Sequence, residues 1–183
     1  MTLTNAPVLV TKNLTLRGPE KSDLAAFTDM VTNSERMKTI GGNGTENDAW
    51  RGFIGGIGHW QWHGYGFFIL EDNVTGLPIG RVDILDHVDW PSPELAWHMF
   101  DGHEGKSLCY EAAVAVRAWA GSIGLPTLIS MIATYNNRSL ALATRMGAKE
   151  KSRMTHENEE TIVMLHLAHD HPTALAQLAE VTP

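Results

Sequence analysis

The chain has 183 residues, 43% of them hydrophobic, and this length suits one globular domain with a sizeable core. The formal net charge of −7 argues against a nucleic-acid-binding surface, and six Trp and five Phe argue against disorder. The single cysteine, Cys109, excludes an internal disulfide, so we expect a reducing, cytoplasmic location.

The N-terminal third predicts one strand and two helices. Residues 9–17 alternate as a strand does, and Asp23 is a suitable cap for a helix over residues 24–31. A polar connection with three glycines, residues 33–47, leads to a second helix from Glu46 to about Trp60.

An uncharged run from Gly52 to Leu70 is long enough to cross a membrane. It contains six glycines and two histidines, which makes it too polar and too flexible for a spanning helix. We therefore expect no membrane segment.

Three antiparallel strands are predicted next. Residues 65–71 and 78–85 are rich in aromatic and branched side chains and form a hairpin around Gly76. Residues 94–100 alternate as a third strand after the turn-like Trp90 to Pro93.

A loop with Gly102 and Gly105 then leads into an Ala-rich helix from about Lys106 to Gly121. The first N–H groups of a helix have no partner within it, and the helix dipole adds partial positive charge there. Glycines let a phosphate approach the backbone closely, so this junction is a candidate anion site.

The last third predicts an αβ segment and a closing hairpin. The expected elements are a buried strand over residues 127–134, a helix from Asn136 to Met146 capped by Gly147, and strands over 151–156 and 161–167. A weak amphipathic helix from about residue 170 would form a short C-terminal extension and a partner surface.

The stretch from Glu94 to Ala112 resembles the acetyl-CoA site of the GNAT N-acetyltransferase superfamily. It aligns without a gap with the pattern E-I-G-Y-W-L-x-P-x-x-W-G-K-G-Y-A-T-E-A of the branch that contains the ribosomal-protein N-terminal acetyltransferases. Glu94, Gly105, Lys106, Glu111 and Ala112 match outright, and Trp97 replaces one aromatic residue by another. The later segment with Asn136, Ser139 and Gly147 resembles a second motif of the same family.

Several positions depart from the family pattern. Ser107 stands where a second loop glycine is usual, and its Cβ leaves less room for a phosphate to approach the backbone. Gly102 stands where Gln or Arg is common. Arg145 and Ala148 replace Lys and Phe of the second motif, and Ala143 occupies the place of a tyrosine that acts as the acid in many members.

The resemblance implies one domain over residues 1–183 with an α/β, GNAT fold: a mixed, mostly antiparallel central sheet with helices on both faces. It implies an acetyl-CoA-dependent transferase that acetylates a primary amine of a peptide, protein or small molecule. Implied contacts to acetyl-CoA come from Met99, Phe100, Gly102, His103, Glu104, Gly105, Lys106, Ser107, Leu108 and Asn136. The main-chain N–H of Met99 or Phe100 would face the thioester oxygen.

Amine acetylation needs a base for the amine proton and a group near the leaving sulfur. Glu94 and His98 share one strand face, because strand side chains alternate, and both are candidate bases. Glu94 ranks first by resemblance, with a structural hydrogen-bonding role as the alternative, and Asp83 and Asp86 on the preceding strand rank behind Glu94 and His98. Ser139 is the candidate near the sulfur, with helix capping as the alternative.

Four aromatic residues of the second helical segment are candidates for a wall of the acceptor site, and burial in the core is the alternative for each: Trp50, Phe53, Trp60 and Trp62. His59 with His63, and the group His166, His169 and His171, lack a convincing further ligand, so no metal is expected.

A second function remains open, namely a catalytically inactive GNAT-fold module that binds acyl-CoA. The residues at Ser107 and Ala143 favour it, whereas Glu94, His98 and Ser139 favour the enzyme. The sequence leaves open the acceptor amine and whether the chain forms a homodimer.

Overall fold

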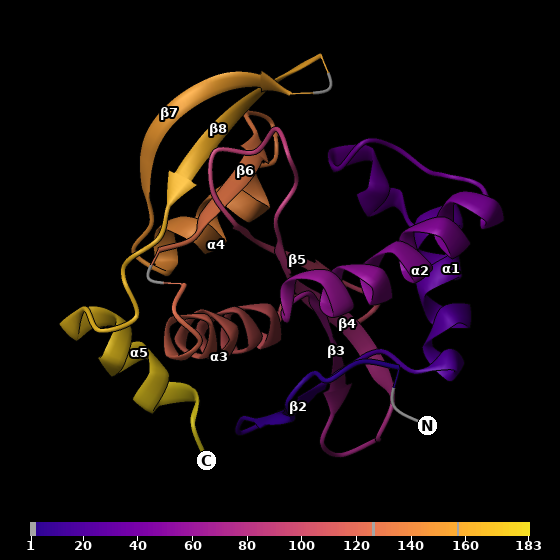
Figure 1. The fold of residues 1–183 in the computed structure, drawn as a ribbon, viewed down its shortest axis with the longest axis horizontal. Helices are drawn as coiled ribbons and strands as arrows, with labels where there is room; N and C mark the ends of the chain where they lie inside the picture. Colours follow the sequence, from indigo (N-terminus) through magenta and orange to yellow (C-terminus); the bar gives the residue numbers. More distant parts are fainter. Residues whose placement is uncertain (1–2, 126, 157) are drawn as a thin grey trace.

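The computed structural model describes residues 3–125, 127–156 and 158–183. In these ranges eight strands form one sheet in the order β1-β2-β3-β4-β5-β6-β8-β7, with five α-helices around it (Figure 1). Neighbouring strands are antiparallel except for β5 and β6, which run parallel. The predicted α/β fold with a mixed, mostly antiparallel sheet is confirmed.

The strands are β1 (Leu9–Val10), β2 (Leu14–Arg17), β3 (Phe67–Asp72), β4 (Pro78–Leu85), β5 (Glu94–Met99), β6 (Ile129–Ala133), β7 (Lys149–His156) and β8 (Glu159–Leu165). The α-helices are α1 (Leu24–Asn33), α2 (Glu46–His63), α3 (Leu108–Ser122), α4 (Asn137–Arg145) and α5 (Pro172–Val181). Two short 3-10 helices, η1 (Lys21–Asp23) and η2 (Glu35–Thr39), flank α1.

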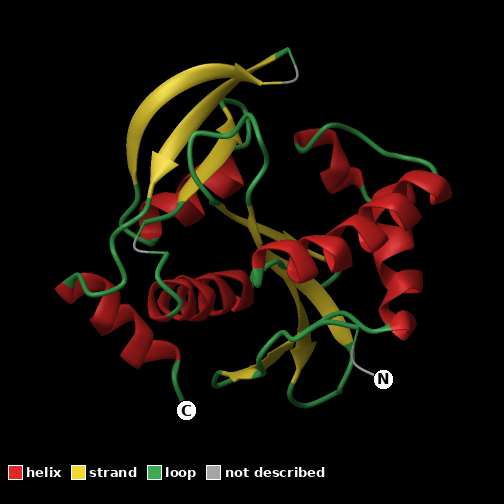
Figure 2. Ribbon diagram, in the orientation of Figure 1, coloured by secondary structure: helices red, strands yellow, loops and turns green. Residues whose placement is uncertain are grey.

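Helices cover both faces of the sheet (Figure 2). Strand β3 shows why, because its side chains alternate between two cores. Phe67 and Ile69 pack with residues of α1 and α2, whereas Phe68 and Leu70 pack with residues of α3. A strand that is apolar on both faces lies in the middle of a layered fold.

The N-terminal segment differs from the prediction. The expected single strand over residues 9–17 is two short strands that pair with each other, with Leu9 opposite Leu16. A tight turn separates them, since the N–H of Thr11 donates to the carbonyl of Leu14. Alternation alone does not reveal such a turn, because both halves keep the period of a strand.

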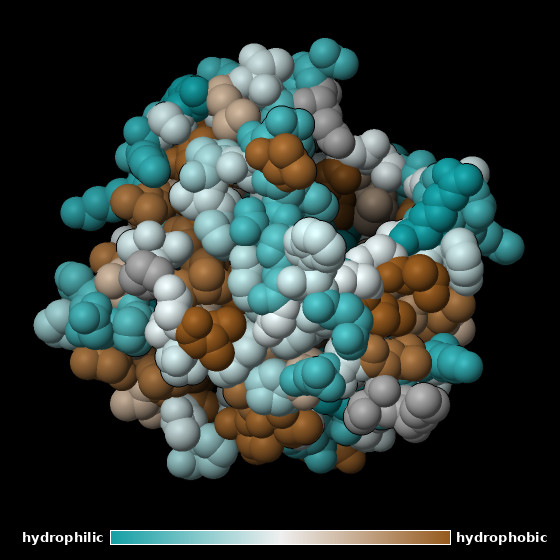
Figure 3. Space-filling model, viewed as in Figure 1, coloured by the Kyte–Doolittle hydropathy of each residue, from teal (hydrophilic) through white to brown (hydrophobic). Residues whose placement is uncertain are grey.

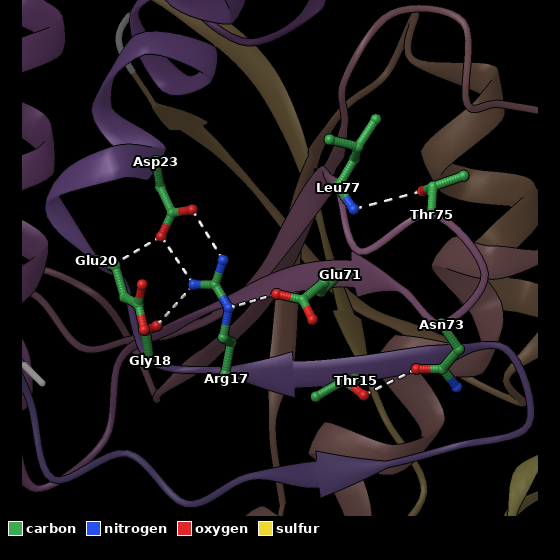
Figure 4. A network of polar contacts seen from close by, with 9 residues as sticks. All are labelled: Thr15, Arg17, Gly18, Glu20, Asp23, Glu71, Asn73, Thr75 and Leu77. Atoms are coloured by element: carbon green, nitrogen blue, oxygen red, sulfur yellow. Dashed lines mark hydrogen bonds and ion pairs between the residues drawn. The ribbon is translucent and has the colours of Figure 1, made fainter.

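An ion-pair network fixes this segment to the sheet (Figure 4). Arg17 of β2 donates two hydrogen bonds to Asp23, at 2.8 and 3.0 Å, and one to Glu71 of β3 at 2.8 Å. These carboxylates raise the pKa of Arg17 further above its usual value. The bidentate pair holds the start of α1 against the sheet.

The C-terminal helix α5 packs against α3. Arg117 of α3 is buried and donates to the carbonyl of Met146 at 2.9 Å and to Gln177 of α5 at 2.7 Å. The inner face of α5, with Leu178, is therefore occupied within the chain, while Leu175 is exposed and a partner surface on the outer face stays a prediction. On the face shown in Figure 3, hydrophobic residues appear in separate patches, one of them on the α1–α2 side.

Candidate active site

The parallel strands β5 and β6 pair at one position, Glu94 with Ile129, and then diverge. We call this point of divergence the vertex, and side chains hold the two strands together there. Glu94 Oε1 accepts a hydrogen bond from the N–H of Met131 at 2.6 Å, and Ser130 Oγ donates to the carbonyl of Leu95 at 2.5 Å. Because the ladder stops here, the facing edges of both strands beyond the vertex are open to a ligand.

Two cavities meet at this gap. The first, of about 390 Å³, lies among β5, the first turn of α3, α4 and η2. The second, of about 810 Å³, extends from β5 and β6 to η2 and β8. Four residues beside the gap line both cavities: Trp97, His98, Asn136 and Ser139. A ligand in the gap therefore reaches both cavities.

The loop before α3 has the backbone of an anion site. Gly102 and Gly105 have φ angles of 87° and 77°, a left-handed conformation that glycine adopts at little cost. A Cβ on Gly105 would meet nothing within 4 Å, so the space in front of the loop is open. Cationic side chains also line the first cavity, and they are Arg36, Lys106, Arg138 and Arg145.

Ser107 keeps the conformation that a glycine would have at its position. Its φ of 60° and ψ of 9° are left-handed, and it forms the N-cap position of α3. Its hydroxyl accepts a hydrogen bond from Arg145 at 2.9 Å, and that guanidinium lies 3.9 Å from the centre of the Tyr110 ring. The serine thus holds a cation beside the loop, which no sequence argument indicated.

Most of the predicted site residues come together. The first cavity is lined by His98, Met99, His103, Glu104, Gly105, Lys106, Ser107, Leu108, Asn136 and Ser139, and the second by Glu94 together with His98, Asn136 and Ser139. Phe100 and Gly102 are not among the residues that line either cavity.

Phe100 has a structural role in the core and in the pairing of β5 with β4. Its ring packs in the core beneath α1 and α2, and its N–H donates to the carbonyl of Ile79 at 2.9 Å. The N–H groups of successive residues point to opposite edges of a strand, so that of Met99 points away from β4. Of the two expected donors to the thioester oxygen, only Met99 has an N–H directed toward the gap.

Ser139 lies where the two cavities join. Its hydroxyl accepts a hydrogen bond from Trp97 Nε1 at 3.3 Å, and its N–H donates to the side chain of Asn136 at 3.2 Å. Asn136 therefore caps α4, and the three residues of this chain of contacts, Trp97, Ser139 and Asn136, line both cavities. Ala143, at the place of the family's tyrosine, is fully buried in a small core with Ile132.

The two candidate bases have different environments. Burial raises the pKa of Glu94 to about 8, although the hydrogen bond from Met131 lowers it. Burial holds the pKa of His98 well below its usual value, and Arg81 adds to this. At neutral pH Glu94 is therefore mostly protonated and His98 is neutral, and the burial that keeps His98 neutral also disfavours its protonated form.

The predicted aromatic wall is wrong. Trp60 packs in the core with Phe68 and Trp119, at centroid distances of 5.1 and 5.7 Å, while Trp50 and Trp62 are 51% and 85% exposed. None of the four predicted aromatic residues lines either cavity. Helix α2 turns its apolar side to the sheet, which carries these rings away from the gap.

The connection between α1 and α2 lines the cavities instead. Met37, Thr39 and Ile40 line both cavities. Arg36 anchors this connection to the loop before α3, with an ion pair to Asp101 at 2.9 Å and a second to Glu104. The only sequence signal here was a polar, Gly-containing connection, which gives no indication of these contacts.

The histidines have structural contacts. His59 bonds the carbonyl of Tyr65 at 2.8 Å and the N–H of Asp86 at 3.0 Å, which uses both ring nitrogens. His166 bonds Ser130 at 2.8 Å. In the part of the chain that the structure describes, no group of three or more His, Cys, Asp or Glu side chains is arranged to hold a metal ion.

Comparison with known proteins agrees with this geometry. Residues 13–149 match the family model of the acetyltransferase (GNAT) domain. The chain belongs to the GNAT acetyltransferase family. Members use acetyl-CoA as the co-substrate, and the loop and first cavity of this GNAT acetyltransferase fit that role.

An acetyltransferase from Agrobacterium tumefaciens is 33% identical, with a TM-score of 0.81 over 87% of this chain and 94% of that one. A protein from Bordetella pertussis described as a GNAT-family acetyltransferase is 24% identical, with a TM-score of 0.74 over 87% and 99%. A ribosomal L7/L12 alpha-N-protein acetyltransferase in complex with coenzyme A is 12% identical, with a TM-score of 0.70 over 88% and 98%, and shares the fold. No protein of curated function matched the sequence.

Among the residues that the structure describes, no helix combines the length and the hydrophobicity needed to cross a membrane.

Proposed function

We propose that this GNAT protein is an acetyl-CoA-dependent N-acetyltransferase whose acceptor is a primary amine of a peptide, a protein or a small molecule. The observation that carries the proposal is the open gap between β5 and β6, which joins two cavities. Transfer between two substrates requires both to reach one point in a fixed orientation, and the gap is that point.

The first cavity would hold the CoA moiety. The N–H groups of the loop from Gly102 to Ser107, with the side chains of Lys106 and Arg145, suit its phosphates. The open edge of β5 and the side chain of Asn136 suit the amide groups of its pantetheine arm. The Met99 N–H would stabilise negative charge on the thioester oxygen during transfer.

His98 would accept the amine proton. It lines both cavities and its ring is neutral at physiological pH, so one ring nitrogen has a free lone pair for the amine proton as the amine nitrogen bonds to the acetyl carbon, provided that a nearby counter-charge offsets the burial. The carbon–sulfur bond breaks in the same transfer; the Ser139 hydroxyl would donate a hydrogen bond to the leaving thiolate, which takes its proton from solvent. Glu94, protonated below about pH 8, would chiefly hold the vertex.

The second cavity would take the acceptor. Its lining includes the aromatic rings of Trp90 and Tyr135 and the exposed carboxylate of Glu159. Such a surface suits a cationic amine with an apolar neighbouring group. An N-terminal peptide residue and a small-molecule amine both meet this description.

Calorimetric titration with acetyl-CoA tests the cofactor site. We expect micromolar binding by the wild type and loss of binding in Gly105→Trp, which fills the open space before the loop. Gly76→Trp is the matched control, since Gly76 has a similar φ of 67° but lies in the β3–β4 turn outside both cavities. Wild-type protein that fails to bind acetyl-CoA would contradict the proposal.

Release of CoA thiol in the presence of short peptides, polyamines, amino acids and aminoglycosides then tests the reaction. The alternative, a binding module without activity, is favoured by the buried Ala143 in place of the usual acid. Tight acetyl-CoA binding without thiol release for any amine would support that alternative.

A further inference from the structure

Asp83 of β4 is a buried carboxylate that the proposed reaction does not yet use. It is fully buried, and among the described residues neither of its oxygens has a hydrogen-bond partner. Two cationic or titratable side chains lie beside it, with Arg81 Nη1 at 3.3 Å and His98 Nδ1 at 3.9 Å from its Oδ2. Such a group is costly to retain, since a buried charge normally needs hydrogen bonds.

The strand register explains how Asp83 comes to lie there. Asp83 is paired with Ala96, and Glu94 and His98 are the residues two positions either side on the same face of β5. Diagonal neighbours on antiparallel strands lie within reach of long side chains. On this face of the sheet Asp83 therefore stands between the two candidate bases, Glu94 and His98.

The two ring nitrogens of His98 have different surroundings: one faces Asp83, and the other faces the cavities. Nδ1 is buried, has no hydrogen-bond partner among the described residues, and is on the side of Asp83. The exposed part of the side chain, 16% of its surface, lies in the lining of the two cavities and leaves Nε2 for the substrate. A separation of 3.9 Å exceeds a hydrogen bond, but catalytic contacts often shorten when substrates bind.

We propose that Asp83 is a positioning residue for the proposed acetyl transfer: its carboxylate holds the proton of His98 on Nδ1, so that Nε2 faces the acceptor amine as the proton acceptor. This inference rests on the proposed function. A carboxylate behind a histidine fixes the tautomer and stabilises the imidazolium that forms when the ring takes a proton.

The charges around Asp83 agree with this role. Burial raises its pKa to about 6, against the effect of Arg81, so the group is ionised at neutral pH. The other ionisable groups affected by its charge are Glu94 on β5 and Cys109 on α3, and its charge contributes to the raised pKa of both. Activity should therefore decline as the pH falls below about 6, because protonated Asp83 no longer accepts the Nδ1 proton.

Asp83→Asn tests the proposal, because it keeps the shape and removes the charge. We expect kcat to fall about 100-fold or more, with the KM for acetyl-CoA within about twofold and the decline near pH 6 abolished. Asp89→Asn, which removes the same charge from an exposed loop, is the control and should behave as the wild type.

A nitrogen-15 spectrum of the His98 ring, assigned with His98→Gln, gives a readout that needs no activity. The wild type should show the Nδ1–H tautomer, and Asp83→Asn should shift the ring toward Nε2–H, because the asparagine amide can donate to Nδ1. An unchanged kcat, or an unchanged tautomer in the variant, would overturn the proposal. If no amine is acetylated at all, the proposed function fails, while the tautomer still decides the role of Asp83.

Discussion

Substitutions of Glu94 can show whether this residue is a catalytic base or only holds β5 and β6 together. Its Oε1 accepts a 2.6 Å hydrogen bond from the N–H of Met131, at the point where β5 and β6 part, and the residue is 7% exposed. Glu94→Gln keeps an oxygen for that bond and removes the ionisable group. Glu94→Ala removes both and leaves a buried N–H without a partner.

The two variants should differ in stability near pH 5, where the wild type has lost little stability to the ionisation of Glu94. A buried donor left without a partner costs about 1–3 kcal/mol, and lost packing adds to this in Glu94→Ala. A domain of this size loses about 2–4 °C of melting temperature per kcal/mol, so we expect Glu94→Ala to melt roughly 5–10 °C below the wild type. Glu94→Gln should stay within about 1 kcal/mol of the wild type near pH 5.

The pH dependence gives the sharper test. The folded pKa of Glu94, about 8, lies above its ordinary value of 4.5, so the folded state favours the protonated form. The stabilisation is fully present below pH 4.5 and is lost as the pH rises through about 8, by at most about 5 kcal/mol. Glutamine cannot ionise, so Glu94→Gln should become the more stable protein at pH 9.

Urea unfolding of the three proteins at pH 5, 7 and 9 measures these differences directly. Thiol release at each pH adds the catalytic side: Glu94→Gln should retain most of its kcat if His98 is the base. A constant free-energy difference between Glu94→Gln and the wild type across this pH range would refute the argument. So would a Glu94→Gln protein as unstable as Glu94→Ala.

Other variants probe the parts of the site that hold β5, the cofactor and the outer wall. Gly80→Ala places a Cβ 2.6 Å from the carbonyl oxygen of His98, so we expect β5 to shift, with a loss of about 1–3 kcal/mol by urea unfolding and a reduced kcat; unchanged kinetics would count against a rigid β5. Arg145→Ala removes a cation held by Ser107 beside the loop, and we expect acetyl-CoA to bind about 3- to 10-fold more weakly by calorimetry, without a change in acceptor KM. Trp62→Ala should leave both KM values and kcat unchanged, because that ring is 85% exposed and lies outside the cavities; a raised acceptor KM would restore α2 to the acceptor wall.

The sequence alone determined the features that depend on local chemistry. Alternation and helical spacing located the three antiparallel strands and the helices after Lys106 and Asn136, and the glycines of the loop predicted an anion site at the start of α3. The ungapped motif from Glu94 to Ala112 identified the family, which residues 13–149 confirm. The helix cap by Asn136 was also predictable, since one side chain reaches an N–H three residues on.

Tertiary structure decided everything that joins distant segments. The vertex bond of Glu94 to Met131, the anchoring of Arg36 to Asp101, and the position of Asp83 beside His98 depend on how strands and loops pack. A shift of one residue in the pairing of β4 and β5 would place Asp83 and His98 on opposite faces.

The assignment of aromatic residues to a wall failed for the same reason. Whether a ring on α2 faces the core, the solvent or a cavity depends on the rotation of the helix about its axis, which the sheet beneath it sets. Helical spacing shows which residues share a face, but the burial of that face is a property of the packed molecule.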